Sequence, residues 1–234
     1  MLLRLEEIGS HPPAFSVYAG PSAQKSELEK TLEPVLDRGT LFDELVEKAG
    51  KSSTGSAIFY SMGRTYLIRP PFPVKEEGLI RGYNPSQLKM LLEHNWKLIL
   101  ILIRLGYYAI GSFKGEELVA YKAGTGLVHA RHHKGGSSAQ RFARHRAKQM
   151  EYFFTRIEGH ARELIEPQLA GTDYIIYGGT RATLQVMWRQ CGFFKKLEPK
   201  VIPRLLTVRE PKYSSLKEAV EQAYTSTVFE FEEK

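Results

Sequence analysis

The chain has 234 residues, of which 42% are hydrophobic and 25% are charged, so a wholly disordered polypeptide is excluded. This length can bury one good core, or one core together with a small accessory domain. The 33 lysines and arginines outnumber the 26 acids and give a net charge of +7 at pH 7, which favours a polyanionic partner without identifying one.

Residues 1–84 are expected to form an accessory α/β region. Its N-terminal residues acquire acids too early for a signal peptide. The patterns that follow predict helices over 23–38 and 41–48 and a β-hairpin with strands over 57–61 and 65–68. The sequence Asn84-Pro85-Ser86 indicates a helix start, and we place the boundary between the two regions there.

Residues 85–234 are expected to form the second and larger domain. The apolar run over 98–104 predicts a central strand covered on both faces. Its most apolar part has six residues, whereas a membrane-spanning helix needs about 20. The remaining patterns predict strands over 106–113, 117–122, 127–131, 173–177 and 205–208, and helices over 140–165, 181–190 and 214–224. This order predicts an α/β fold, a mixed sheet with helices packed against it.

The long helix expected over 140–165 carries an apolar stripe. Its members recur at spacings of four and three and are Ala143, Ala147, Met150, Phe154, Ile157, Ala161 and Leu164. Such a stripe predicts that one side of the helix packs on the sheet. Cys191, the only cysteine, excludes an internal disulfide and is expected to be a buried thiol without a catalytic role. A reducing compartment is therefore expected, and we predict a cytoplasmic protein without a membrane segment.

The segment 131–148 concentrates the positive charge. It holds six lysines and arginines, three histidines and no acid, and the residues predicted to bind RNA are Arg131, His132, His133, Lys134, Arg141, Arg144, Arg146 and Lys148. At about 100° per residue, Arg141, Arg144 and Lys148 share the side opposite the apolar stripe. The alternative is a solvated surface, but the absence of acids for i,i+4 pairs favours contact with a phosphate backbone.

A loop of small residues precedes this helix. Gly135-Gly136-Ser137-Ser138-Ala139 has almost no side-chain bulk and wide backbone freedom. Such a loop can enter a narrow cleft of a partner and carry Gln140 close behind it. A glutamine amide can donate and accept hydrogen bonds at once and stays neutral beside phosphates. Gly135, Gly136 and Gln140 are therefore the candidate residues for insertion into a partner, and the resemblance given below makes them the candidate catalytic residues.

This pattern resembles a known family. The order strand, His-His-Lys-Gly-Gly, small residues, Gln-Arg-Phe-Ala-Arg and long helix is similar to the catalytic domain of Vms-type peptidyl-tRNA hydrolases, which are relatives of the middle domain of eukaryotic and archaeal class I release factors. The later sequence over 174–180 also resembles the strand and glycine turn of that domain. The resemblance covers roughly residues 85–234.

The resemblance implies an RNase H-like fold and action at the peptidyl-transferase centre of the large ribosomal subunit. It implies contacts with rRNA and peptidyl-tRNA, no cofactor and a monomer. The reaction would free stalled nascent chains in ribosome quality control, either by hydrolysis of the ester or by cleavage of the tRNA near its 3′ end. By position, Gly135 and Gly136 match the glycine pair of the family. Ser137 stands where a release factor has its glutamine, so we expect Gln140 to act from a shifted position.

Other functions fit parts of the sequence. A metal-dependent nuclease of the RNase H type needs clustered carboxylates, but the strands expected over 98–104, 107–113 and 127–131 contain no acid, so we expect no metal site. The turn Gly178-Gly179-Thr180 lacks the lysine of a P-loop. A non-catalytic protein that binds the ribosome or tRNA through the basic helix stays open as the alternative.

Overall fold

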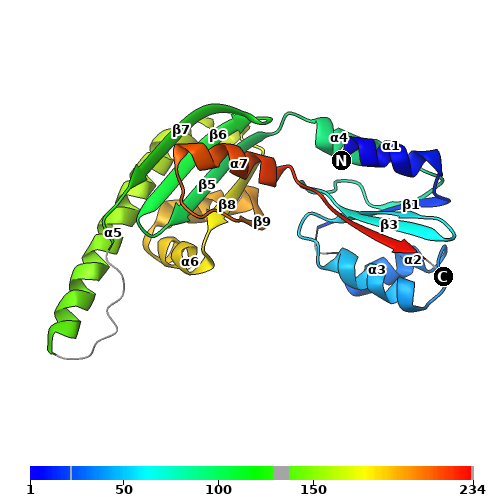
Figure 1. Ribbon diagram of the computed structural model, residues 1–234, viewed down its shortest axis with the longest axis horizontal. Helices are drawn as coiled ribbons and strands as arrows, with labels where there is room; N and C mark the ends of the chain where they lie inside the picture. Colours follow the sequence, from blue (N-terminus) through cyan, green and yellow to red (C-terminus); the bar gives the residue numbers. More distant parts are fainter. Residues whose placement is uncertain (22, 129–136, 233–234) are drawn as a thin grey trace. The chain divides into compact units, whose positions relative to one another are not determined.

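The structure is a computed structural model that describes residues 1–21, 23–128 and 137–232, with the backbone alone for 137–139. It divides the chain into two compact units (Figure 1). The first unit comprises Met1–His94 together with Tyr224–Lys234, and the second comprises Asn95–Ala223. The division lies ten residues after the expected boundary, and the C-terminal residues return to the first unit because they pair with its sheet.

The first unit is built on an antiparallel five-stranded sheet with the order β10-β3-β2-β1-β4. Its elements are α1 (Leu2–Ser10), β1 (Phe15–Ala19), α2 (Lys25–Leu32), α3 (Thr40–Gly50), β2 (Ser56–Tyr60), β3 (Arg64–Arg69), β4 (Gly78–Arg81), α4 (Ser86–Glu93) and β10 (Thr227–Glu232). The expected hairpin is confirmed, because β2 pairs with β3 in antiparallel register. Val17, Ile58 and Leu67 of the sheet pack against Phe42 and Leu45 of α3.

The helix expected over 23–38 is shorter in the structure. It ends at Leu32, with Glu33 as its C-cap. Pro34 follows directly, and a proline has no N–H to donate to the carbonyl oxygen four residues earlier, so it cannot continue the hydrogen bonds of the helix. The prediction was therefore wrong for residues 33–38.

The second unit contains a mixed five-stranded sheet with the order β7-β6-β5-β8-β9. Its strands are β5 (Lys97–Arg104), β6 (Tyr107–Lys114), β7 (Glu117–Thr125), β8 (Tyr174–Gly179) and β9 (Val201–Leu206). The first three form antiparallel pairs, whereas β8 lies parallel to β5 and to β9. The central strand β5 is buried from Leu98 to Ile103. The expected mixed sheet with packed helices is confirmed.

Helices cover both faces of this sheet. They are α5 (Ser137–Ile165), α6 (Arg181–Gln190) and α7 (Tyr213–Ala223), with the short 3-10 segments η1 (Glu166–Gly171) and η2 (Gly192–Lys200). Ile99 and Ile101 share a core with α5 and α6. Leu216 of α7 lies close to Gly111, which pairs with Leu100, so α7 covers the opposite face.

Two strands differ from the sequence prediction. The strand expected over 117–122 is longer in the structure, because β7 pairs with β6 as far as Thr125. Position 124 of this strand has room only for a glycine, because a Cβ atom added there would lie 2.6 Å from the Tyr108 hydroxyl. Residues 127 and 128 are not in a strand, and the rest of the strand expected over 127–131 lies outside the described residues. The strand expected over 205–208 is found earlier, over Val201–Leu206.

Candidate functional site

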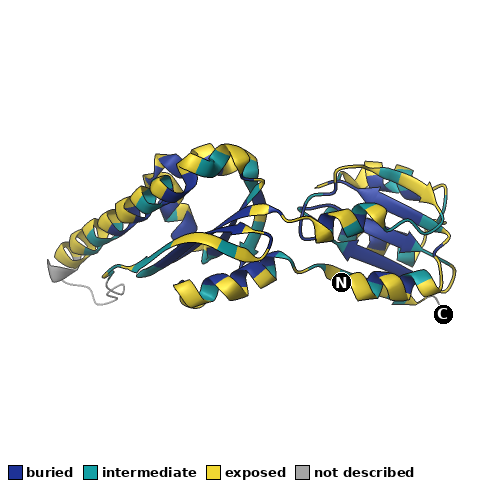
Figure 2. Cartoon of the chain, turned by 90° about the horizontal axis from the view of Figure 1, so that it is seen from above, coloured by how far each residue is buried: buried dark blue, intermediate teal, exposed yellow. Residues whose placement is uncertain are grey.

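Helix α5 is longer than the sheet on which it packs. Its 29 residues span about 43 Å at 1.5 Å per residue. From Phe153 onward the helix contributes buried side chains to the core, whereas none of the residues 140–152 is buried. The N-terminal half therefore projects beyond the sheet (Figures 1 and 2).

Only part of the apolar stripe predicted for α5 packs against the core. Phe154, Ile157, Ala161 and Leu164 are buried in the core, and Met150 packs at its edge. The remaining two members, Ala143 and Ala147, are exposed, so the prediction that they pack on the sheet was wrong. The physical reason is that the sheet ends before the helix does.

Polar contacts fix the second half of α5 to the sheet. The Tyr108 hydroxyl of β6 forms a hydrogen bond of 2.6 Å with His160 Nδ1. Arg156 Nη1 donates to the Thr125 carbonyl oxygen at 3.1 Å, and Lys122 Nζ lies 2.8 Å from a Glu163 carboxylate oxygen. These contacts and the core together support the projecting half from its base.

Two of the three acids of α5, Glu158 and Glu163, lie in its second half and have partners there. Glu158 lies 2.8 Å from an Arg162 Nη atom and also accepts the Phe193 backbone N–H at 3.1 Å. Ion pairing with Lys122 lowers the pKa of Glu163. The first acid of the helix is Glu151. The positive charge of the first half is therefore not neutralised within the helix.

Arg141, Arg144 and Lys148 form the cationic face of α5. All three side chains are exposed, and no ion pair joins them to any residue that the structure describes. At 100° per residue they lie within about 60° of one another. The three residues therefore lie on one side of α5, where the helical spacing placed them. Arg146 is half-buried and lies about 140° around the helix from Arg141, so it is not part of this face.

Gln140 is exposed in the first turn of α5. The first backbone N–H groups of a helix have no partner within the helix and carry its positive dipole end. Gln140 belongs to this first turn. The other predicted site residues lie outside the described residues; they are Arg131, His132, His133, Lys134, Gly135 and Gly136.

Sequence reasoning did not single out Tyr152. Its side chain is 76% exposed, and it follows Lys148 by one helical turn on the same side as the cationic face. An aromatic ring beside cations can stack on an unpaired base. The sequence did indicate this residue, because a tyrosine on the polar side of an amphipathic helix does not pack into the core.

The two units differ in charge. The second unit holds 21 lysines and arginines against 11 acids, whereas the first holds 12 against 15. The net positive charge of the chain therefore resides wholly in the second unit, at +10, while the first unit has a net charge of −3. This distribution gives the unit that carries α5 a long-range attraction for polyanions. Among the described helices, none is long and apolar enough to cross a membrane.

Comparison with known proteins gives a family match and several similar folds. The archaeal translation termination factor aRF1 is 16% identical, with 94% of this chain and 69% of that chain covered and a TM-score of 0.45. An archaeal protein is 16% identical, with 94% and 70% covered and a TM-score of 0.40. Pelota from Archaeoglobus fulgidus is 11% identical, with 90% and 55% covered and a TM-score of 0.32.

The family match rests on sequence rather than on shape. A model of the Actinobacteria/chloroflexi VLRF1 release factors matches residues 96–229, which is more than half of the chain and includes the whole of α5. The resemblance to release factors inferred from the sequence is thereby confirmed. The chain belongs to the Actinobacteria/chloroflexi VLRF1 release factor family.

Proposed function

We propose that the protein is a release-factor-like peptidyl-tRNA hydrolase that frees nascent chains from stalled large ribosomal subunits. The observation that carries this proposal is the projecting half of α5, on which Arg141, Arg144 and Lys148 are exposed and form no ion pair with any described acid, with Gln140 in the first turn. A helix of this kind can extend into an RNA-walled space while its other half stays in the protein core. Membership of a release factor family supports the same activity.

The cationic face provides the contact with RNA. Arg141, Arg144 and Lys148 cover about 10 Å along the helix at 1.5 Å per residue. Arginine side chains can form paired hydrogen bonds with phosphate oxygens, and lysine adds a point charge. Because these groups form no ion pair with the part of the chain that the structure describes, binding to phosphate does not require that such a pair be broken first. The rRNA and tRNA backbones are the polyanions that fit this face.

Gln140 provides the polar group that meets the reacting ester. Water attacks the ester carbonyl carbon, the bond to the tRNA ribose oxygen breaks, and a proton passes from the water to that oxygen. The amide of Gln140 orients the water, and the backbone N–H groups at the start of α5 favour the negative charge that develops on the carbonyl oxygen. Cleavage of the tRNA near its 3′ end is the second outcome that the same placement supports.

Release from stalled complexes tests the proposal. Ribosome–nascent-chain complexes are incubated with wild type, Gln140→Ala and Gln190→Ala, which removes an exposed glutamine at the end of α6. We expect release with wild type and Gln190→Ala and a loss of about 100-fold with Gln140→Ala, the scale of one lost transition-state contact. Analysis of the tRNA 3′ end distinguishes ester hydrolysis, which leaves it intact, from cleavage. Unchanged release by Gln140→Ala would remove this residue from the mechanism.

The second candidate function is non-catalytic binding to the ribosome or tRNA. It is favoured by the position of Gln140, which lies within the helix and not directly after Gly136, where Ser137 stands. In that case wild type binds large subunits but releases no peptide, and Gln140→Ala binds equally well. The cationic face serves both functions, so binding alone does not separate them.

A further inference from the structure

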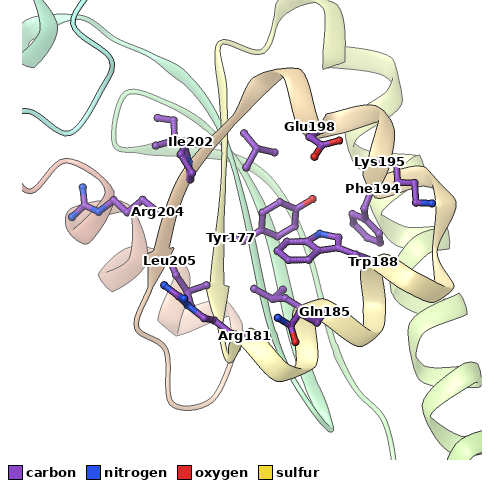
Figure 3. A pocket seen from close by; sticks show the side chains of 13 residues that line it. Tyr177, Arg181, Gln185, Trp188, Phe194, Lys195, Glu198, Ile202, Arg204 and Leu205 are labelled. Carbon is purple, nitrogen blue, oxygen red and sulfur yellow. The ribbon is translucent and has the colours of Figure 1, made fainter. Parts of the chain in front are cut away.

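The second unit contains a pocket that the proposed function does not use. Its volume is about 690 Å³, and it lies between α6, η2 and strand β9 (Figure 3). Tyr177 and Leu205 contribute from the sheet, Trp188 from α6 and Phe194 from η2. A pocket of this size is in the range that holds a small organic ligand.

The hydroxyl of Tyr177 is buried at the side of this pocket. Tyr177 is 4% exposed, and its Oη atom makes no hydrogen bond of good geometry with any described residue, although the Trp188 side chain lies close enough to interact with it. The rings of Trp188 and Phe194 stand edge-on to the Tyr177 ring, with centroids 5.4 and 6.4 Å away. Figure 3 shows the hydroxyl directed towards Phe194 and Glu198. Buried hydroxyls are normally paired, so an atom that supplies a hydrogen bond here is favoured.

The other polar groups lie around the aromatic rings. Gln185 and Glu198 line the pocket and offer an amide and a carboxylate to a ligand. Arg181 also lines it, at the first position of α6, and its side chain is exposed. Arg204, by contrast, is directed away, since its guanidinium donates to the Gln222 carbonyl oxygen at 2.8 Å.

The start of α6 is open to an anion. The Thr180 side chain at the N-cap makes no capping bond to the helix backbone and instead lies 2.7 Å from the Thr183 hydroxyl. The first N–H groups of α6 are therefore not satisfied by the usual side chain. Together with Arg181 they form a place where a phosphate is stabilised. This place is about 10 Å along the helix from Trp188.

A peptide strand fits the pocket less well. Strand β9 is at the edge of its sheet, and a peptide that joins an edge needs a continuous row of backbone donors and acceptors. Pro203 lies in the middle of β9 and has no N–H, which interrupts that row. An apolar side chain would also leave the Tyr177 hydroxyl unpaired.

We infer that this pocket binds a nucleotide, with the base against Trp188 and the phosphate at Arg181 and the start of α6. A planar base has a face that stacks on an indole and edge atoms that pair with the Tyr177 hydroxyl, Gln185 and Glu198. The distance from Trp188 to Arg181 suits the distance between a base and its phosphate. The nucleotide is either free or an unpaired residue of an RNA, and both sources share this chemistry.

The experiment measures binding to the full-length protein by calorimetry and by tryptophan fluorescence. The probes are AMP, GMP, CMP and UMP, the matching nucleosides, and single-stranded RNA hexamers. The variants are Trp188→Ala, Trp188→Phe, Arg181→Ala and Tyr177→Phe, with Arg189→Ala as a control on the same helix, outside the pocket lining. Trp188 is 37% exposed, so its replacement leaves the core in place.

We expect at least one mononucleotide or hexamer to bind and Trp188→Ala to weaken it tenfold or more. Trp188→Phe should retain much of the affinity that Trp188→Ala loses, and Arg189→Ala should bind nucleotides as wild type does. Arg181→Ala should weaken nucleotides but leave nucleosides unchanged. Tyr177→Phe should weaken the base contact and yet raise the melting temperature, because it removes an unpaired buried hydroxyl.

Three results would overturn the inference. They are no binding of any probe at millimolar concentration, equal binding by wild type and Trp188→Ala, and nucleotide binding that Arg189→Ala weakens as much as Trp188→Ala does. Binding of hexamers without mononucleotides assigns the pocket to an RNA residue, and the reverse assigns it to a free nucleotide. Because the readout is binding and not peptide release, its result is independent of the Gln140 test.

Discussion

Tyr108 of β6 and His160 of α5 are joined by a hydrogen bond of 2.6 Å between Oη and Nδ1. Tyr108 is fully buried, and burial raises the pKa of its hydroxyl, so the group stays protonated at neutral pH. The contact lies at the base of the projecting half of α5. The orientation of α5 on the sheet, and with it that of the cationic face, therefore depends on a polar contact as well as on apolar packing.

Replacement of Tyr108 by phenylalanine tests this contact. The ring remains in the core, but His160 loses its partner, so we expect the free energy of unfolding to fall by about 1 kcal/mol. Urea denaturation measures the change. Tyr152→Phe is the control, because the Tyr152 side chain is 76% exposed and its hydroxyl should not affect stability. Equal stabilities for the two variants would mean that the bond to His160 contributes nothing.

Two glycine substitutions should have opposite effects. In Gly124→Ala the new methyl group lies 2.6 Å from the Tyr108 hydroxyl, so we expect a loss of about 1–3 kcal/mol through overpacking. In Gly159→Ala nothing lies within 4 Å of the new group, and helix propensity should raise stability by about 0.5–1 kcal/mol. Thermal denaturation of both variants checks the signs. A stabilised Gly124→Ala would contradict the close packing of β7 on Tyr108.

Removal of the cationic face should weaken binding to RNA in a salt-dependent way. For Arg141→Ala, Arg144→Ala and Lys148→Ala combined, we expect affinity for large subunits to fall about tenfold or more. The slope of log affinity against log salt should decrease by about 2 to 3, since each lost phosphate contact removes about 0.7–0.9. Filter binding between 50 and 300 mM salt, roughly the range over which such contacts are screened, measures both.

The control for this experiment removes the same charge from the first unit. Lys25→Ala, Lys30→Ala and Lys51→Ala combined replace three exposed or half-exposed lysines there. If charge alone decides affinity, the two triple variants behave alike, and the cationic face has no special role. If the face of α5 is the interface, the control retains the wild-type slope.

Cys191 gives the chain a dependence on alkaline pH. Burial raises the pKa of its thiol from 9.0 to about 12. The folded protein therefore holds this proton more tightly than the unfolded chain does, so the contribution to stability is complete below pH 9 and is lost as the pH rises towards 12. We expect the free energy of unfolding to fall more steeply between pH 9 and 11 in wild type than in Cys191→Ala. Parallel pH profiles would contradict this.

Local patterns predicted the parts of the fold that depend on neighbouring residues. The apolar run of β5 and the second half of the α5 stripe follow from periods that burial imposes on a strand and a helix. Cys191 is buried, as its position indicated. The overestimate of α2 came from the apolar pattern, which continues past Pro34 although the proline lacks the N–H that a helix needs at that position.

Long-range pairing was harder to predict. In strand β10, apolar Phe229 and Phe231 alternate with Glu230 and Glu232, and this alternation is typical of a strand. Its partner β3 lies more than 150 residues earlier, and nothing local indicates that pairing. For the same reason the C-terminal residues were assigned to the second domain.

The candidate site was predictable in one respect only. Helical spacing correctly placed Arg141, Arg144 and Lys148 on one side, because that depends on 3.6 residues per turn alone. The exposure of Ala143 depends instead on where the sheet ends, which no local pattern encodes. The pocket around Tyr177 combines side chains from four separate elements, so no local pattern could predict it.

Because β10 belongs to the first unit, the sheet of that unit is completed only after the second unit has been synthesised. The outer edge of β3 pairs with residues 227–232, which are made after all of the second unit, Asn95–Ala223. During translation the second unit is therefore complete while the first sheet still lacks a strand. The backbone groups along that edge of β3 stay without their final partner until residues 227–232 leave the exit tunnel.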